Sequence, residues 1–155
     1  MEPRAATPMR RLETLRRLTQ AGVPTTVMVA PVIPALNDME IERILEAAQA
    51  AGVKEAGYVL LRLPLEVRDL FREWLIANYT DRYRHVFKLI RDMRGGKDYD
   101  STWGTRMKGT GPYAWMIGRR FEMACEKLGL NVARSSLTTE HFHKPKPGAE
   151  QLSLL

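Results

Sequence analysis

The sequence predicts an α/β fold that contains two parallel strands. Segments 23–33 and 55–63 are rich in β-branched and other apolar residues, as strands buried on both faces are. Pro31 and Pro34 are expected to end the first of them. Between the two, segment 38–51 carries apolar residues at helical spacing. A strand, a helix and a second strand in this order form a crossover unit, so we expect both strands to lie parallel in one sheet.

Helices are predicted before, between and after the strands. Thr7 followed by Pro8 is typical of a helix start, and Gly22 is typical of a helix end. Asn37 or Asp38 is expected to cap the helix between the strands, because both residue types favour that position. Apolar residues at helical spacing predict the remaining helices at 8–21, 65–78, 80–93 and 112–128.

The predicted sheet is too small to be complete. Parallel sheets need neighbouring strands and covering layers, and two strands cannot bury both of their faces. We therefore expect residues 1–64 to be the last strand–helix units of a larger fold whose N-terminal part is missing from this chain. Residues 65–130 would form a helical extension with a basic and aromatic loop at 94–111, and residues 131–155 a flexible tail. The alternative is a mostly helical domain with a two-stranded insert.

The charge and the cysteine content narrow the class of protein. The 155 residues include 24 Lys and Arg against 18 Asp and Glu, and the formal charge of +6 permits contact with nucleic acid or another anion. Cys125 is the single cysteine, so the chain by itself cannot form an internal disulfide or a multi-cysteine metal site. No apolar run approaches the roughly 18 residues of a membrane span, and the N-terminus lacks a signal-peptide layout. The expected location is the cytoplasm.

Four sequence blocks resemble a known family. They are "EPRAATPMRRLETLRRLTQAGVPTTVMVAPVIPALND", "AGYVLLRLPLEVRDLFREWL", "MRGGKDYD" and "RMKGTGPYA", which occur in this order. Together they are similar to the C-terminal half of bacterial radical S-adenosylmethionine proteins that are related to spore photoproduct lyase and described as DNA-repair-photolyase-like. The resemblance extends from residue 1 to about residue 131.

The resemblance implies a fold and a cofactor pair. The family fold is a partial β/α barrel of six parallel strands, in which residues 25–33 would form the fifth strand and residues 56–63 the sixth. Intact members hold a four-iron cluster on a C-x3-C-x2-C motif and cleave S-adenosylmethionine reductively. This sequence does not contain that motif. We therefore expect the chain alone to be inactive and to bind neither cofactor stably, and nucleic acid is a possible substrate of the intact enzyme.

The family pattern also suggests cofactor contacts. Arg4 would lie at the carboxyl end of the missing fourth strand, where it could pair with a carboxylate of the cofactor or of the substrate. The alternative for Arg4 is a solvated surface arginine. By resemblance, Val29, Ala30 and Pro31 would form an apolar wall against the adenine of S-adenosylmethionine.

Arg62 interrupts an otherwise apolar strand near its carboxyl end. Burial of an arginine is costly unless its charge is paired. The residue is therefore expected either to contact an anionic ligand or to form a structural ion pair, for which Glu66 is the nearest candidate along the chain.

A polar stretch from Arg94 to Tyr113 mixes cationic and aromatic side chains. This combination suits phosphates and unstacked bases, whereas the alternative is a solvated loop that packs its aromatic rings on the barrel. The nucleic-acid contacts predicted here are Lys97, Tyr99, Trp103, Arg106 and Lys108.

The remaining candidates lie near the C-terminus. Cys125 has helical spacing with Phe121 and is expected to be a core thiol. His141 and His143 are too few ligands for a metal site. The terminal peptide resembles the motif by which bacterial repair proteins dock on the replication sliding clamp, and a frayed apolar end is the alternative. Its residues are Gln151, Leu152, Leu154 and Leu155. A second function class, a non-catalytic basic domain that binds nucleic acid or a partner protein, stays open.

Overall fold

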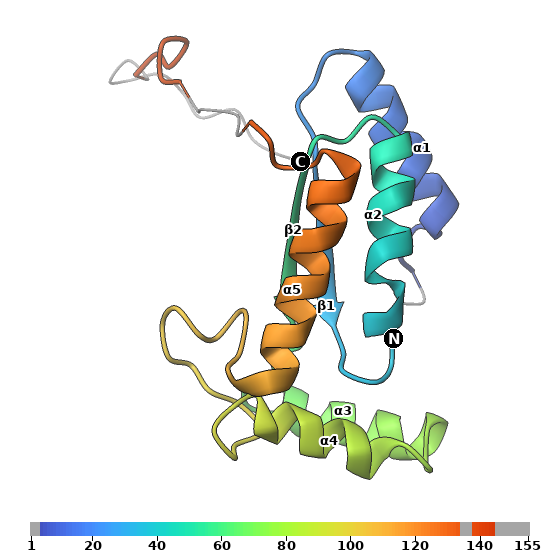
Figure 1. Ribbon diagram of the computed structural model, residues 1–155, viewed down its shortest axis with the longest axis vertical. Helices are drawn as coiled ribbons and strands as arrows, with labels where there is room; N and C mark the ends of the chain where they lie inside the picture. The colour runs from blue at the N-terminus through green and yellow to red at the C-terminus, as the bar shows by residue number, and fades with distance from the viewer. Residues whose placement is uncertain (1–3, 134–137, 145–155) are drawn as a thin grey trace, which may run out of the picture.

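The computed structural model describes residues 4–133 and 138–144. These residues form a mixed α/β fold with two parallel strands and five α-helices (Figure 1). In chain order the elements are α1 (Pro8–Gln20), β1 (Thr26–Val32), the 3-10 turn η1 (Asp38–Glu40), α2 (Ile41–Ala50), β2 (Glu55–Leu60), α3 (Val67–Asn78), α4 (Tyr83–Asp92) and α5 (Gly111–Leu128). Every predicted helix and strand is present, and the predicted parallel pairing is confirmed.

The two strands pair in a register that breaks near its end. Thr26 lies opposite Glu55 and Val29 opposite Tyr58, but Val32 lies opposite Leu60, so β1 has one more residue than β2 across this step. Pro31 falls within the irregular part of β1. The expectation that Pro31 ends the strand is therefore wrong, because a residue that lacks an N–H can be accommodated where the ladder is interrupted.

One face of the sheet is covered by α2 and α5, which lie side by side over both strands (Figure 1). Val29 and Leu60 belong to the same core cluster as Leu45 of α2 and as Ile117 and Phe121 of α5. The tilted rings of Tyr58 and Phe121, 4.8 Å apart between centroids, extend this contact to the middle of β2. This face supplies the main hydrophobic core.

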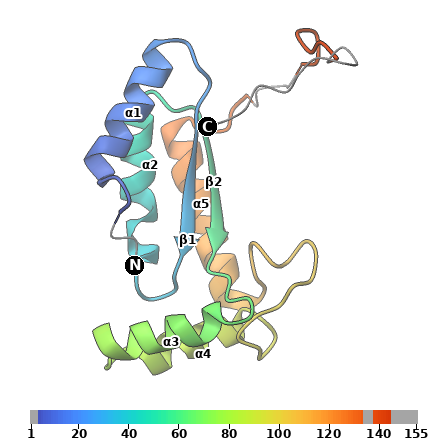
Figure 2. The same cartoon turned by 180° about the vertical axis from the view of Figure 1, so that it is seen from behind.

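The opposite face of the sheet carries no helix from the described residues (Figure 2). Met28 points to this side and has 56% of its surface exposed, and its terminal methyl lies over Gly57. Ala30 is exposed as well. The structure therefore leaves half of a parallel sheet open, whereas such sheets are usually covered on both faces.

The two edges of the sheet differ. Along β2, the Asn131 side chain accepts from the Ala56 N–H at 2.8 Å and donates to the Ala56 carbonyl at 3.0 Å. Further along, the Leu60 N–H donates to the Met107 carbonyl at 2.9 Å. The far edge of β1, in contrast, pairs with no strand in the part of the chain that the structure describes. The edge that could accept a further strand is thus the β1 edge.

Helix α1 begins as predicted, with the Thr7 hydroxyl accepting from the Arg10 N–H at 3.4 Å. None of its residues is buried. It is attached to α2 by the Thr19 hydroxyl, which donates to the Ala51 carbonyl at 2.8 Å. Met9 is 75% exposed and Leu18 40%, so apolar side chains of α1 face solvent.

Helices α3 and α4 pack as a pair across the carboxyl ends of the strands (Figures 1 and 2). They form a second core cluster in which Phe71 and Leu75 of α3 meet Phe87 of α4. Ile33 and Leu63, which follow the two strands, join the same cluster. The helical extension therefore stands directly below the end of the sheet where parallel α/β proteins bind ligands.

Candidate functional site

The candidate site is the region where β1 and β2 end and the loop after α4 begins (Figure 1). Two buried or half-buried arginines, Arg62 and Arg94, lie there. The hydrogen-bond partners of each guanidinium group show which of the two arginines is available to a ligand.

Arg62 is half-buried directly after β2. Its Nη2 donates to the Tyr99 hydroxyl at 3.1 Å, and its guanidinium carbon lies 5.9 Å from the centroid of the same ring. Its Nε is buried without a hydrogen-bond partner. The expected ion pair with Glu66 is wrong, because none of the ion pairs among the described residues includes Arg62. A buried, unsatisfied guanidinium N–H suits an anionic ligand.

Arg94 is a structural residue and is only 4% exposed. Its Nη1 donates to the carbonyls of Thr105 at 3.1 Å and Arg106 at 2.8 Å, and its Nη2 donates to the Leu61 carbonyl at 3.1 Å. Burial lowers the pKa of the Arg94 guanidinium, and nearby Asp100 opposes that shift. Arg94 therefore fastens the 94–110 loop to the end of β2, a role that its place in a basic stretch did not indicate.

The other basic and aromatic residues of this loop separate into two groups. Tyr99 is half-buried against Arg62, as the packed-loop alternative expects. Trp103 is 82% exposed, and the Arg106 guanidinium stacks on it at 4.4 Å from the ring centroid. Lys97 and Lys108 are exposed. The structure thus presents an open Trp–Arg pair beside a closed Tyr–Arg pair.

Asn37 occupies the N-cap position of η1, as predicted, but its side chain makes no capping hydrogen bond. Asp38 does not cap α2, whose N-cap residue is Glu40. The Asn37 Oδ1 accepts from the Ile33 N–H at 2.7 Å, and its Nδ2 donates to the Pro31 carbonyl at 3.1 Å. These bonds close the turn after β1. The Asp38 carboxylate, 5% exposed, instead accepts from the Tyr113 hydroxyl at 2.6 Å.

A polar cluster joins α2 to α5 around Asp38. Arg120 makes a bidentate pair with Glu42 at 2.8 and 2.7 Å and also donates to the Asp38 carbonyl at 3.1 Å. Burial, followed by the bond to Asp38, raises the pKa of Tyr113 to about 12. Sequence reasoning missed this cluster because 75 residues separate Asp38 from Tyr113. Contacts between residues so far apart in the sequence leave no trace in the spacing of apolar residues along one helix.

The residues of the suggested adenine wall do not share one surface. Val29 is 7% exposed and belongs to the core under α2 and α5. Ala30 and Pro31 are exposed. Arg4 is exposed ahead of α1. Of the wall, only Ala30 and Pro31 are thus accessible to a ligand in the described residues.

Cys125 is buried in the core, as predicted, and burial raises the pKa of its thiol. It does not fit an iron–sulfur cluster, which needs several accessible thiolates. No group of three or more potential metal ligands occurs in residues 4–133 and 138–144, and His141 and His143 are exposed. The clamp-like residues Gln151, Leu152, Leu154 and Leu155 lie outside the described residues.

No helix among the described residues has both the length and the apolar character to cross a membrane.

The chain is similar to longer bacterial proteins. Over 93 residues it is 31% identical to uncharacterized proteins of Mycobacterium tuberculosis and Mycobacterium bovis. The match covers 57% of this chain and 27% of each relative, so the chain corresponds to about a quarter of their length. No protein-family model matches the chain. No solved structure matches it either.

Proposed function

We propose that this chain is the C-terminal part of a radical S-adenosylmethionine enzyme and that its two strands end a partial β/α barrel. The open sheet face carries the proposal. Met28 and Ala30 face solvent from a parallel strand whose outer edge has no partner in the described residues. A parallel sheet of this kind is stable when further strands continue it and helices cover it.

The arrangement of α1 supports the same conclusion. In a β/α barrel each helix follows a strand and packs outside the sheet. Helix α1 lies beside α2, beyond the β1 edge, and keeps Met9 and Leu18 exposed (Figure 2). A further strand next to β1 would give the side chains of Met9 and Leu18 an apolar surface to pack against. The longer mycobacterial relatives, of which the match covers 27%, have room for such strands.

The residues present fit S-adenosylmethionine better than they fit the cluster. Arg62 retains a buried, unpartnered Nε, and it would hold a carboxylate of the cofactor or of the substrate. Ala30 and Pro31 would give apolar contact to the adenine, and Arg4 would lie close to the same rim. Cys125 is unsuited to the iron, so the three thiolates would come from the N-terminal part. Together the two cofactors supply radical chemistry when bound.

Co-expression tests the proposal. The chain would be produced with the remaining part of the Mycobacterium tuberculosis relative, reconstituted anaerobically with iron and sulfide, and assayed with dithionite for 5′-deoxyadenosine. We expect a soluble complex that forms this product, no product from the chain alone, and at least a tenfold loss on Arg62→Ala. The matched control is Arg43→Ala on the outer side of α2. A relative that binds no iron, or a chain that cleaves the cofactor by itself, contradicts the proposal.

The proposal extends to location and partners. The cytoplasm suits an oxygen-sensitive cluster and a single reduced thiol. Nucleic acid is the proposed substrate, and residues 151–155 are a proposed clamp-binding peptide. The second function class, a non-catalytic basic binding domain, would be favoured if the chain bound nucleic acid while the complex formed no 5′-deoxyadenosine.

A further inference from the structure

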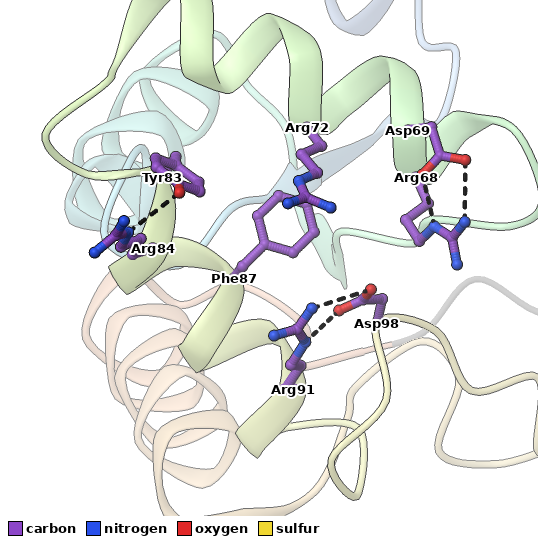
Figure 3. Close-up of a pocket in the computed structure, with 8 residues that line it drawn as sticks. All are labelled: Arg68, Asp69, Arg72, Tyr83, Arg84, Phe87, Arg91 and Asp98. Atoms are coloured by element: carbon purple, nitrogen blue, oxygen red, sulfur yellow. Dashed lines mark hydrogen bonds and ion pairs between the residues drawn. The ribbon is translucent and has the colours of Figure 1, made fainter.

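A cationic groove lies between α3 and α4 (Figure 3). Its volume is about 420 Å³. Four arginines line it, namely Arg68, Arg72, Arg84 and Arg91. They come from the two helices that follow the sheet, Arg68 and Arg72 from α3 and Arg84 and Arg91 from α4 (Figure 3).

Two of the four charges are balanced within the groove. Arg68 forms a bidentate contact with Asp69 at 2.9 and 3.0 Å, and Arg91 contacts Asp98 at 2.6 and 3.4 Å. With four guanidinium groups and two carboxylates, the groove keeps a net charge of +2. Such a surplus in a concave surface attracts anions.

The two remaining arginines contact no carboxylate in any ion pair of the described residues. Arg84 donates to the Tyr83 hydroxyl at 3.1 Å, and Arg72 projects across the groove above Phe87 (Figure 3). The Arg84 guanidinium lowers the pKa of the Tyr83 hydroxyl, with a smaller contribution from Arg72. Both guanidinium groups therefore keep donors that neither groove carboxylate, Asp69 or Asp98, accepts in an ion pair.

A second hollow of about 410 Å³ adjoins the groove. The two share a wall formed by Arg68, Asp69 and Asp98. Lys97 and Tyr99 line the second hollow. Each hollow thus combines a cation with one tyrosine ring, Tyr83 in the first and Tyr99 in the second. A repeated pairing of this kind suits a chain of nucleotides, in which phosphates meet cations and unpaired bases meet rings.

We propose that the α3–α4 groove binds single-stranded nucleic acid, with phosphates on Arg72 and Arg84 and the strand continuing into the hollow beside Tyr99. Tyr99 contacts Arg62 at 3.1 Å, so the track leads to the carboxyl end of β2. Only this direction toward the strand ends rests on the proposed function. The binding itself stands without it.

The test measures fluorescence anisotropy of a labelled single-stranded oligothymidylate with the whole chain between 50 and 200 mM salt. Arg72→Gln/Arg84→Gln is compared with Arg43→Gln/Arg119→Gln on α2 and α5. All four arginines are exposed, and both double variants lower the formal charge of +6 by two. Unchanged thermal melts check that both variants fold.

We expect the groove variant to lose about tenfold in affinity and its salt slope to fall by about 1.4, since a single strand releases about 0.7 counterion per phosphate contact. The control should change by less than about twofold. Equal losses in both variants, binding of a duplex as tightly as of a single strand, or displacement of the oligonucleotide by millimolar inorganic phosphate would each overturn the proposal. Failure of the radical assay leaves this measurement unaffected.

Discussion

The Tyr113 hydroxyl of α5 donates to the buried Asp38 carboxylate at 2.6 Å and thereby ties α5 to the turn that follows β1. Arg120 reinforces the same junction through Glu42. The cluster keeps α2 and α5 in place over the covered face of the sheet. A short bond between a neutral hydroxyl and a carboxylate is strong, and its loss leaves a buried acceptor unsatisfied.

Tyr113→Phe should destabilise the fold by about 1–3 kcal/mol at neutral pH, because Asp38 loses its hydroxyl donor. The wild-type pKa of Tyr113 is raised to about 12, from 10.0. A raised pKa stabilises the fold below pH 10, and this contribution is lost as the pH rises toward 12. The free energy of unfolding, measured with urea between pH 9 and 12, should therefore fall more steeply with pH for the wild type than for the variant. Parallel curves would contradict this assignment.

Arg94→Met should cost about 2–4 kcal/mol, since three backbone carbonyls lose their charged donor. It should also release the 94–110 loop from β2. Limited trypsin digestion followed by mass spectrometry would detect faster cleavage after Lys97 and Arg106. Arg119→Met is the control, because Arg119 is exposed and its ion pair is with Glu122 of the same helix, outside the loop. Equal protection of the loop in the Arg94 variant would show that other contacts hold it.

Asn131 closes the outer edge of β2 with both atoms of its amide, and its φ is +61°. Asn131→Ala removes the two hydrogen bonds to Ala56 and a weaker one to the Cys125 Sγ at 3.7 Å. Alanine also lacks asparagine's tolerance for the left-handed region, so we expect a loss of about 2–3 kcal/mol. Asn131→Gly removes the same bonds but relieves the backbone and should lose about 1 kcal/mol less. Chemical denaturation of the two variants separates the contributions. An alanine variant as stable as the glycine variant would show that the left-handed backbone at residue 131 contributes no strain.

The open sheet face should make the isolated chain self-associate. Met28→Asp places a charge on that face and should reduce both dimer formation in sedimentation experiments and binding of a hydrophobic dye. Met123→Asp on α5 is the matched control, because Met123 is 55% exposed and Met28 56%. Neither change should alter the free energy of unfolding by more than about 1 kcal/mol. Equal effects of the two variants on association would argue against the sheet face as its cause.

Much of the fold could be predicted from the sequence. The helices and strands were located to within about three residues because apolar spacing reports which side of a segment is buried. The strand pair at 26–32 and 55–60 and its parallel direction followed from the helix between them. The predicted core position of Cys125 followed from its spacing with Phe121 in the same way.

Candidate site residues were harder to assign. Arg62 and Arg94 both lie in sequence contexts that suggest an anion contact. Arg94, however, donates to three backbone carbonyls, whereas the Nε of Arg62 is buried without a hydrogen-bond partner. Asn37 and Asp38 have the composition of helix caps, but a turn and a distant tyrosine use their side chains. The hydrogen-bond partner of each side chain depends on which groups the fold brings next to it, and local sequence propensity does not show this.

The sequence by itself determined the secondary structure, the parallel strand pair and the net positive charge, because these depend on residue type and spacing along one segment. Only the tertiary structure decided that α2 and α5 cover a single sheet face and that Val29 turns inward while Ala30 stays exposed. It also brought Arg72 and Arg84 together across two helices. The physical reason is that burial and charge pairing are properties of neighbours in space, and these neighbours are far apart in the chain.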